Sequence, residues 1–555
     1  LERARDAIRE RRKTGLDEAV TVFVHGGEYR LPKTFLLAKE DSGTAEKPVV
    51  WRAFGDEKPV LVGGAAVTRW EQVADDARTG GRVLVADLDA HGIGKAAFSQ
   101  VVSLGRRQPQ ARWPNFDPEN PYGGGWAYVD GTVVSMHADV PGDDKRMLLQ
   151  KPSDVRTWAR PTDGEVFIFP RYNWWNNVVR IETFDAAARR IVLAADCSYA
   201  IRPGDRYYVQ GHREELDSAG EWHHDRESRR LFYLPPEDSG ASPHVLVPTL
   251  ATILALQPDT AHVTIRGLTF ECCEGTAVVV SKARHCRIAG CTIRNVGNYS
   301  GSGVSVSGSD NTVVGCDISH TGSHGISIDG GDRRTLAAAN NRAENNYIHH
   351  TGVFYKQGVG ISLTGVGNRV ARNLIHDCPR MGIMFSGNNL VIEYNHIRHV
   401  NLETEDTGAV YTGGRDWISS RGSVIRGNYF HDILGYGRDG EKWVSPHFAW
   451  GVYLDDNTGG VDVVGNIVAR CQRAGIHLHN GRDNRIENNV FVDCGTQQIE
   501  CNGWKADHGH WKSHFDSMVK GYESVAAEPA WQGMRNMKTH PKDAVLPDGL
   551  IMTGN

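Results

Sequence analysis

Acidic, imidazole and aromatic side chains gather in the last third of the sequence, where they suit acid–base chemistry. The members of this group are Tyr411, Tyr453, Asp455, Asp456, His477, His479 and Glu500. Carboxylates and imidazoles transfer protons to and from reacting groups, and a pair of carboxylates is also the arrangement that cleaves a glycosidic bond. We therefore predict a sugar-binding surface in this part of the chain.

Two long segments lead into these residues. They span 400–407, which contains Glu403, Glu405 and Asp406, and 433–450, which ends at Trp450. Loops that leave one side of a repeated scaffold commonly form the walls of a binding site. We expect the first loop to lie beside the strand that carries Asp455.

A simpler structural role is possible for each candidate. Asp406 is suited to cap a turn before Gly408, Asp455 and Asp456 are suited to a turn before Asn457, and the two histidines suit an exposed surface. Two further groups are interpreted as structural. Asp329 precedes a Gly-Gly turn about 19 Å from Asp455 by stacking, and the pairs His376-Asp377 and His431-Asp432 recur with the repeat.

A short repeated pattern must position these side chains. Its clearest part is Gly-apolar-x-apolar-x, which predicts a strand whose second and fourth residues face one way and whose third and fifth face the other. The segments start at Gly303, Gly325, Gly360, Gly382, Gly408, Gly451 and Gly475. Alignment of Gly408 with Gly451 places Val410 and Thr412 on the outward face, level with Tyr453 and Asp455. A repeat of this length indicates a solenoid.

A second column of residues specifies the kind of solenoid. It contains Leu268, Cys291, Cys316, Asn346, Asn373, Asn395, Asn428, Asn466 and Asn489, each followed two residues later by an apolar side chain. A buried asparagine is costly unless its amide is paired. Stacking of one asparagine on the next, about 4.8 Å away, pairs each amide. The sequence therefore predicts an all-β protein, a parallel β-helix.

The position of Asp406 conflicts with that arrangement. It precedes its glycine by two residues, whereas Asp455 follows its glycine by four. Straight strands would place the two aspartates about 20 Å apart. We expect them to meet only if loop 400–407 folds back across the sheet.

Four regions follow from the pattern along the chain. Residues 1–65 begin with an amphipathic helix that suits an end cap and continue into the first coils. Residues 66–245 interrupt the repeat with a β-rich insertion, sandwich-like or barrel-like, rich in Trp and Tyr. Residues 246–503 form the main β-helix with the active site, and 504–555 form a capping tail.

Composition excludes several classes of function. The net charge of −5 argues against a nucleic-acid partner, and no apolar run is long enough for a membrane span. The ten cysteines lack paired metal spacing. Cys291 and Cys316 lie within disulfide reach in the inward column, but are better interpreted as buried thiols. We expect no metal and no cofactor, and the oligomeric state is left open.

Several motifs resemble one known family. Glu405-Asp-Thr-Gly-Ala-Val-Tyr-Thr-Gly-Gly-Arg-Asp-Trp417, Gly451-Val-Tyr-Leu-Asp-Asp456 and the inserted Arg112-Trp-Pro-Asn-Phe116 are similar to bacterial right-handed β-helix proteins of glycoside hydrolase family 141. The resemblance covers nearly the whole chain. It implies a right-handed, pectate-lyase-like solenoid and a secreted or periplasmic enzyme whose signal peptide lies outside this sequence.

The resemblance also implies an activity. Family members include α-L-fucosidases and xylanases, so we expect an exo-acting hydrolase of plant or algal polysaccharides. Asp406 and Asp455 match the expected catalytic aspartates, with Asp456 as a rival. The residues expected to bind substrate are Glu405, Tyr411, Arg415, Trp450, Tyr453, His477, His479 and Glu500.

Two other functions stay open. A polysaccharide lyase that acts on uronic acids would need a Lys or Arg near the site, and Lys356 and Arg380 are available. A non-catalytic glycan-binding protein would carry an aromatic strip along many coils. The concentration of unusual residues in a few coils favours a pocket.

Overall fold

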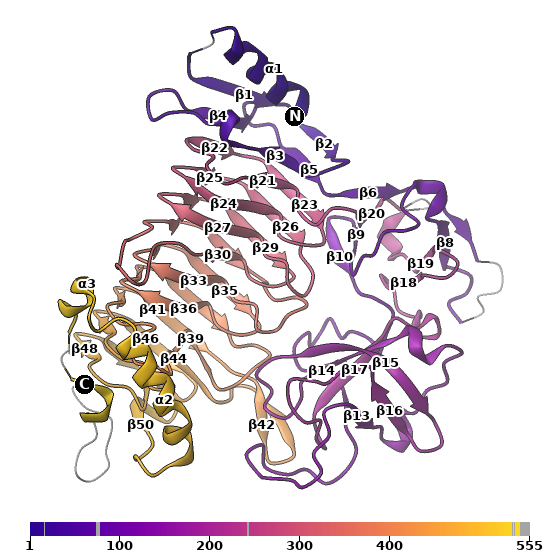
Figure 1. The fold of residues 1–555 in the computed structure, drawn as a ribbon. Coiled ribbons are helices and arrows are strands. Elements are labelled where there is room, and N and C mark those ends of the chain that lie inside the picture. The colour runs from indigo at the N-terminus through magenta and orange to yellow at the C-terminus, as the bar shows by residue number, and fades with distance from the viewer. Residues whose placement is uncertain (16, 74–77, 241–242, 536, 538, 544–555) are drawn as a thin grey trace.

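The computed structural model describes residues 1–15, 17–73, 78–240, 243–535, 537 and 539–543. Three parallel sheets of 11 strands each form a right-handed β-helix, as predicted. The coils stack from the N-terminal end toward the C-terminal end (Figure 1).

The first sheet, called sheet A, consists of β1 (Val20–Val24), β4 (Val49–Ala53), β22 (Val263–Arg266), β25 (Arg287–Ala289), β28 (Thr312–Val314), β31 (Arg342–Glu344), β34 (Arg369–Ala371), β37 (Val391–Glu393), β40 (Val424–Arg426), β45 (Asp462–Val464) and β48 (Arg485–Glu487). Sheet B consists of β2 (Gly27–Arg30), β5 (Pro59–Val62), β23 (Thr269–Cys273), β26 (Thr292–Val296), β29 (Asp317–Thr321), β32 (Tyr347–His349), β35 (Leu374–Cys378), β38 (His396–Val400), β41 (Tyr429–Ile433), β46 (Ile467–Cys471) and β49 (Val490–Val492). Sheet C consists of β3 (Phe35–Leu37), β21 (Leu254–Leu256), β24 (Val278–Arg284), β27 (Val304–Ser309), β30 (Ile326–Ile328), β33 (Ile361–Val366), β36 (Ile383–Asn388), β39 (Thr407–Gly413), β44 (Ala449–Asp455), β47 (Ala474–His479) and β50 (Gln497–Asn502).

The predicted asparagine column forms a continuous ladder inside the solenoid. The side-chain oxygen of Asn373 accepts bonds from the backbone and side-chain N–H groups of Asn346, at 3.0 and 2.9 Å. The same pair of hydrogen bonds links each asparagine to the next, through Asn395, Asn428 and Asn466 to Asn489. A buried amide would otherwise be costly, so the ladder fixes the register of the coils.

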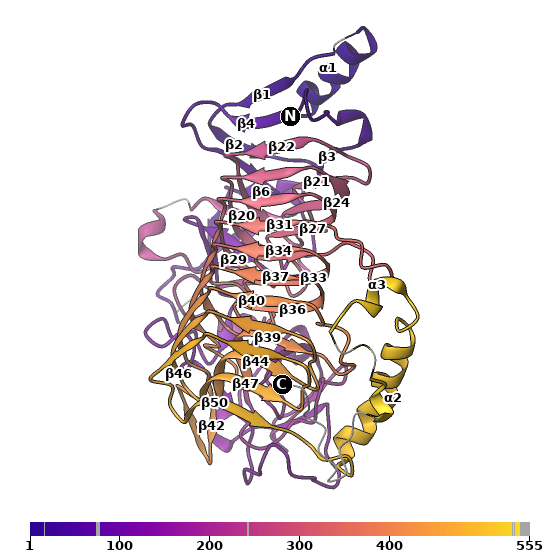
Figure 2. The ribbon, with the colours of Figure 1, turned by 90° about the vertical axis from the view of Figure 1, so that its left-hand side faces the viewer.

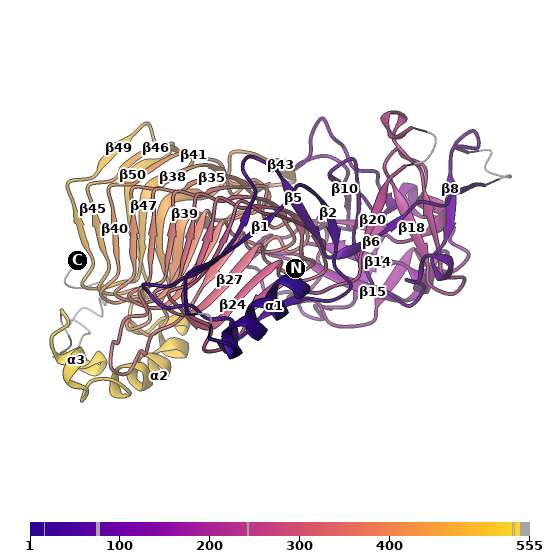
Figure 3. The same cartoon turned by 90° about the horizontal axis from the view of Figure 1, so that it is seen from above.

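Residues between β5 and β21 form the inserted region. It leaves the solenoid through β6 (Gly64–Val67) and returns through β20 (Val245–Pro248), which pairs with β6. Figures 1 and 3 show the inserted region extending to one side of the coils. Its other strands are β7 (Glu71–Gln72), β8 (Leu84–Asp87), β9 (Val101–Ser103), β10 (Arg106–Gln108), β11 (Arg112–Trp113), β12 (Ala127–Tyr128), β13 (Met147–Leu149), β14 (Glu165–Ile168), β15 (Asn177–Asp185), β16 (Arg190–Leu193), β17 (Arg206–Gln210), β18 (Trp222–Asp225) and β19 (Arg230–Tyr233).

The α-helices lie toward the ends of the described chain. Helix α1 (Glu2–Lys13) packs Ala4 and Ile8 against the end of the solenoid core. Helix α2 (Gly509–Glu523) and the short α3 (Pro529–Gln532) run along the side of the last coils (Figure 2). No helix among the described residues has the length and apolar character needed to cross a membrane.

The ladder predicts a specific loss of stability. We expect Asn395→Ala to lower the free energy of unfolding by about 1–3 kcal/mol, because it leaves the buried N–H groups of the neighbouring rung without an acceptor. The exposed amide variant Gln498→Ala should stay within about 0.5 kcal/mol of wild type. Urea unfolding measures both, and equal effects would contradict the role of the ladder.

Candidate active site

Asp455, at the end of β44, is held by residues of the two neighbouring strands of sheet C and by the residue that follows it. The hydroxyl of Tyr411, on β39, donates to Asp455 Oδ2 at 2.8 Å. Nδ1 of His479, on β47, lies 2.7 Å from Asp455 Oδ1, and the backbone N–H of Asp456 donates to the same oxygen at 2.8 Å. The carboxylate is therefore fixed in orientation on the outer face of the sheet.

These contacts keep Asp455 ionised. Burial acts to raise its pKa, but the hydrogen bond and charge of His479 and the hydroxyls of Tyr411 and Tyr453 outweigh it and lower the pKa of Asp455. In return, and against the effect of burial, Asp455 raises the pKa of His479. The pair thus resembles a charged carboxylate–imidazolium pair.

The alignment of β39 with β44 differs by one residue from the prediction. Gly408 is level with Trp450 rather than with Gly451, so Tyr411 pairs with Tyr453 and Gly413 with Asp455. The expectation that Val410 and Thr412 face outward was wrong, because both side chains are buried. The one-residue shift turns the Tyr411 ring toward Asp455 instead.

Arg380 binds the backbone of the loop that carries Asp406. Its guanidinium donates to the backbone carbonyl oxygens of Glu405 at 3.1 Å and Asp406 at 3.4 Å. The backbone N–H of Asp406 bonds to the carbonyl oxygen of Phe448 at 2.9 Å, and the residue has a φ of 53°. These bonds fix the backbone at Glu405 and Asp406. In this position the Asp406 carboxyl lies close enough for the charge of Asp455 to act on it.

The environment of Asp406 has the opposite effect from that of Asp455. Burial and the negative charge of Asp455 raise the pKa of Asp406 to about 7. Burial and Asp455 also raise the pKa of Asp456, although its Oδ2 accepts a bond from Arg415 Nε at 2.9 Å. The site thus places one ionised carboxylate beside two carboxyl groups that retain protons more readily.

Four of the predicted substrate-binding residues form a buried support beside Asp455. Tyr453, His477 and Glu500 are in register on β44, β47 and β50, and the Tyr453 and His477 rings stack at 4.6 Å. Glu500 accepts bonds from Trp450 Nε1 at 2.8 Å and from Arg473. Burial acts to raise the pKa of Glu500, but the hydrogen bonds from Arg473 and Trp450 outweigh it and lower this pKa to about 2. Their other contacts are also made within the protein: Nε2 of His477 lies 3.1 Å from Asn502 Oδ1, and the Tyr453 hydroxyl acts on Asp455.

Glu405 is likewise engaged within the protein. Its Oε2 lies 2.7 Å from His447 Nδ1, and its side chain is almost fully buried. The structure therefore groups Asp406, Asp455 and Asp456 with Tyr411, Arg415, Tyr453 and His479. The remaining predicted residues lie behind this group.

The C-terminal tail forms one wall that the sequence did not predict. Trp504 packs edge-on against His479 at 4.7 Å and stacks with His508 and His510. Burial lowers the pKa of His514, on α2, and the negative charge of Asp456 partly offsets this effect. The only sequence signal was the cluster of Trp and His residues between 504 and 514.

The inserted region forms the other wall. The carbonyl oxygen of Trp174 accepts a bond from Arg380 at 2.9 Å, and the Trp174 ring stacks on Tyr172 at 4.3 Å. Burial, followed by the charge of Arg171, lowers the pKa of His137, on which the charges of Glu405 and His510 also act. Insert, loop 400–407 and tail therefore converge on one site.

Asp455, Asp456 and His479 also form a group with metal-ligand chemistry, since each offers a ligand atom within 4.8 Å of the others. The atoms of this group already accept or share bonds with Tyr411 and Arg415. In this structure these ligand atoms are therefore occupied by hydrogen bonds within the protein.

The two basic residues considered for lyase chemistry are both engaged. Lys356 Nζ lies 2.6 Å from Glu403 Oε1, and both side chains are largely buried. Arg380 binds backbone carbonyl oxygens of the loop. Neither is placed as a free base beside Asp455.

Comparisons with known proteins agree with the fold. A family model described as a right handed beta helix region matches residues 254–337 and 276–448, and no curated protein matches the sequence. A solved structure titled "Glycoside hydrolase" has a TM-score of 0.63 and 19% identity, over 92% of this chain and 94% of that one.

Two other solved structures are more distant. The complex of XylC with xylose has a TM-score of 0.43 and 14% identity, over 86% of this chain and 71% of that one. A PL6 alginate lyase has a TM-score of 0.21 and 11% identity, over 46% of this chain and 74% of that one. Such values carry no argument about activity.

The raised pKa of Asp406 predicts a pH-dependent effect on stability. Between about pH 4 and 7 the folded protein holds a proton that the unfolded chain releases, so stability from this group falls as the pH rises through that range. We expect Asp406→Asn to exceed wild type in the free energy of unfolding by about 1–3 kcal/mol at pH 7.5 and to have no such advantage at pH 4.

Thermal or urea unfolding at the two pH values checks this prediction. The matched control is Asp329→Asn, an exposed aspartate on the same face four coils away. It should show no pH-dependent gain. An advantage of Asp406→Asn that is equal at pH 4 and pH 7.5 would contradict a raised pKa.

Proposed function

We propose that the protein is a glycoside hydrolase with Asp406 and Asp455 as its catalytic pair. The observation that supports it is the opposite direction of their pKa shifts within one buried site. A pair of carboxyl groups whose environments separate their pKa values is suited to act as acid and base in the same reaction.

Asp406 is the proposed general acid. It gives its proton to the glycosidic oxygen as the bond from that oxygen to the anomeric carbon breaks. Asp455 either forms a bond to the anomeric carbon, which water later hydrolyses, or accepts a proton from the attacking water. Tyr411 and His479 hold Asp455 in position for either route.

Burial of the site supports exo action. The side chains of Asp455 and His479 are 14% and 20% exposed, whereas an open groove for internal cleavage would leave them more accessible. The resemblance to glycoside hydrolase family 141 adds α-L-fucosides and xylan as the first substrates to test. It also favours a secreted or periplasmic location, where such polysaccharides are degraded.

Leaving-group dependence distinguishes the two roles. We expect Asp406→Asn to lower kcat/KM about 10²- to 10⁴-fold on natural glycans but much less on nitrophenyl glycosides, whose leaving group needs little protonation. Asp455→Asn should be impaired on both substrate types. A panel of nitrophenyl glycosides, fucosylated glycans and xylan measures this and identifies the sugar.

Asp329→Asn is the matched control and should keep wild-type activity. Activity that survives both catalytic substitutions in folded protein would contradict the assignment. Release of an unsaturated, ultraviolet-absorbing product from a uronate polymer would indicate a lyase instead.

The pH profile of kcat/KM follows from the same shifts. Activity on natural glycans should fall above about pH 7 as Asp406 loses its proton, and should persist into acid because the pKa of Asp455 is lowered. On nitrophenyl glycosides the alkaline limb of the wild type should be shallower, and Asp406→Asn should remove it and keep the acid limb. An unchanged alkaline limb would assign that proton to another group.

A further inference from the structure

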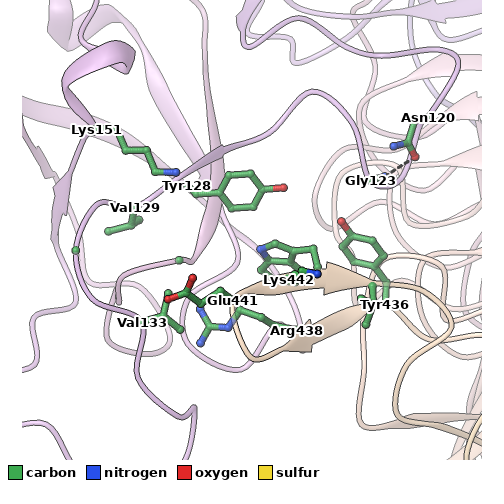
Figure 4. Close-up of a pocket in the computed structure, with 14 residues that line it drawn as sticks. Asn120, Gly123, Tyr128, Val129, Val133, Lys151, Tyr436, Arg438, Glu441 and Lys442 are labelled. Atoms are coloured by element: carbon green, nitrogen blue, oxygen red, sulfur yellow. Dashed lines mark hydrogen bonds between the residues drawn. The ribbon is translucent and has the colours of Figure 1, made fainter.

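A cleft lies between the inserted region and the hairpin β42–β43 (Gly437–Asp439 and Lys442–Val444), and its lining does not include the proposed catalytic aspartates. Its volume is about 700 Å³. Figure 4 shows Tyr128 and Lys151 of the insert facing Tyr436, Arg438 and Lys442 of the hairpin segment. Nothing in the proposed hydrolysis mechanism uses these residues.

Aromatic rings form a substantial part of the cleft lining. Trp443 stacks on Tyr436 with ring centroids 5.4 Å apart and an angle of 14°. Tyr128 lies on the opposite wall, 6.2 Å from Trp443. Tyr128 and Trp443 are partly exposed. Rings with both an apolar face and access to water are suited to pack against the C–H face of a sugar.

Positively charged side chains border these rings, and the charges of Lys151 and Arg438 also act on the carboxyl groups of Asp130 and Asp205. Arg438 donates to the backbone carbonyl oxygens of Pro203 and Val134, at 3.2 and 3.0 Å, and Lys151 Nζ lies 5.6 Å from the Tyr128 ring. Within the described part of the chain, Lys151, Arg438 and Lys442 form no ion pair with a carboxylate at 4 Å or less. With Glu441 as the single acid, the lining carries three positive charges against one negative, or +2, in a chain of net charge −5.

A layer of side chains connects this cleft to the loop that carries Asp406. The Arg206 guanidinium packs on the rings of Tyr436 at 4.8 Å and Trp443 at 5.2 Å. It also donates to the carbonyl oxygen of Glu403 and to Asn173. Asn173 in turn donates to the carbonyl oxygen of Tyr436 at 2.7 Å. A ligand in the cleft therefore lies one layer of side chains from the catalytic loop.

We propose that this cleft is a non-catalytic binding site for an anionic sugar unit, one that carries a carboxylate or a sulfate ester. Trp443 and Tyr128 contact the ring of the sugar, and Lys151, Lys442 and Arg438 neutralise its charge. The site would retain an acidic glycan beside the catalytic site. Binding itself does not require hydrolysis at Asp455, so this proposal stands apart from the proposed activity.

Calorimetric titration of the full chain tests the proposal. The Asp406→Asn/Asp455→Asn background keeps the probes intact, and the probes are tetragalacturonate, a sulfated carrageenan tetrasaccharide and neutral xylotetraose. We expect one or both anionic probes to bind more tightly than xylotetraose, with a Kd that rises with added salt. Preference for tetragalacturonate assigns a carboxylate ligand, and preference for the carrageenan assigns a sulfate ester.

Matched variants separate the cleft from general surface charge. Lys151→Glu/Lys442→Glu should weaken anionic binding at least tenfold, and Lys58→Glu/Lys95→Glu, with the same change in net charge at exposed sites elsewhere, should change it less than twofold. Trp443→Ala, checked for folding by thermal unfolding, should also weaken binding. Equal weakening by the two double variants, or binding of xylotetraose as tight as that of the anionic probes, would overturn the proposal.

Discussion

Parallel pairing of successive coils is the constraint on which the rest of the structure depends. Backbone hydrogen bonds bring equivalent residues of neighbouring coils to about 4.8 Å. Inside the solenoid this spacing lets each asparagine of the ladder serve the one before it. On the outer face the same spacing brings Tyr411, Asp455 and His479 from three different strands into hydrogen-bond contact. Stability and chemistry thus use one repeat distance.

The candidate site is made asymmetric by what surrounds that regular face. Asp455 lies among donors from the sheet, whereas Asp406 comes from a loop and lies in a buried environment that opposes its ionisation. Two residues of the same type therefore acquire different protonation behaviour from different neighbours.

Sequence alone predicted what repeats. The Asn395 column and the glycine-led strands carry the period of the coil, and the β-helix follows from them. The register of β39 was one residue out, because Gly408 resembles the other strand-leading glycines although it is level with Trp450. The role of Arg380 and the contact of Trp504 with His479 occur once each. A single tertiary contact leaves no period in the sequence, so these could not be predicted.

The place of the insertion has a consequence for how the chain folds. Strands β3, β4 and β5 pair on their far side with β21, β22 and β23, which follow more than 180 residues later in the sequence. During synthesis, strands β3, β4 and β5 therefore keep an unpaired edge until the insertion and the strands after it have been made. Contacts of such long range slow folding and expose strand edges to wrong partners. The insertion has its own buried hydrophobic clusters, so it can fold before the early coils are complete. Pairing of β6 with β20 then brings β3, β4 and β5 close to β21, β22 and β23.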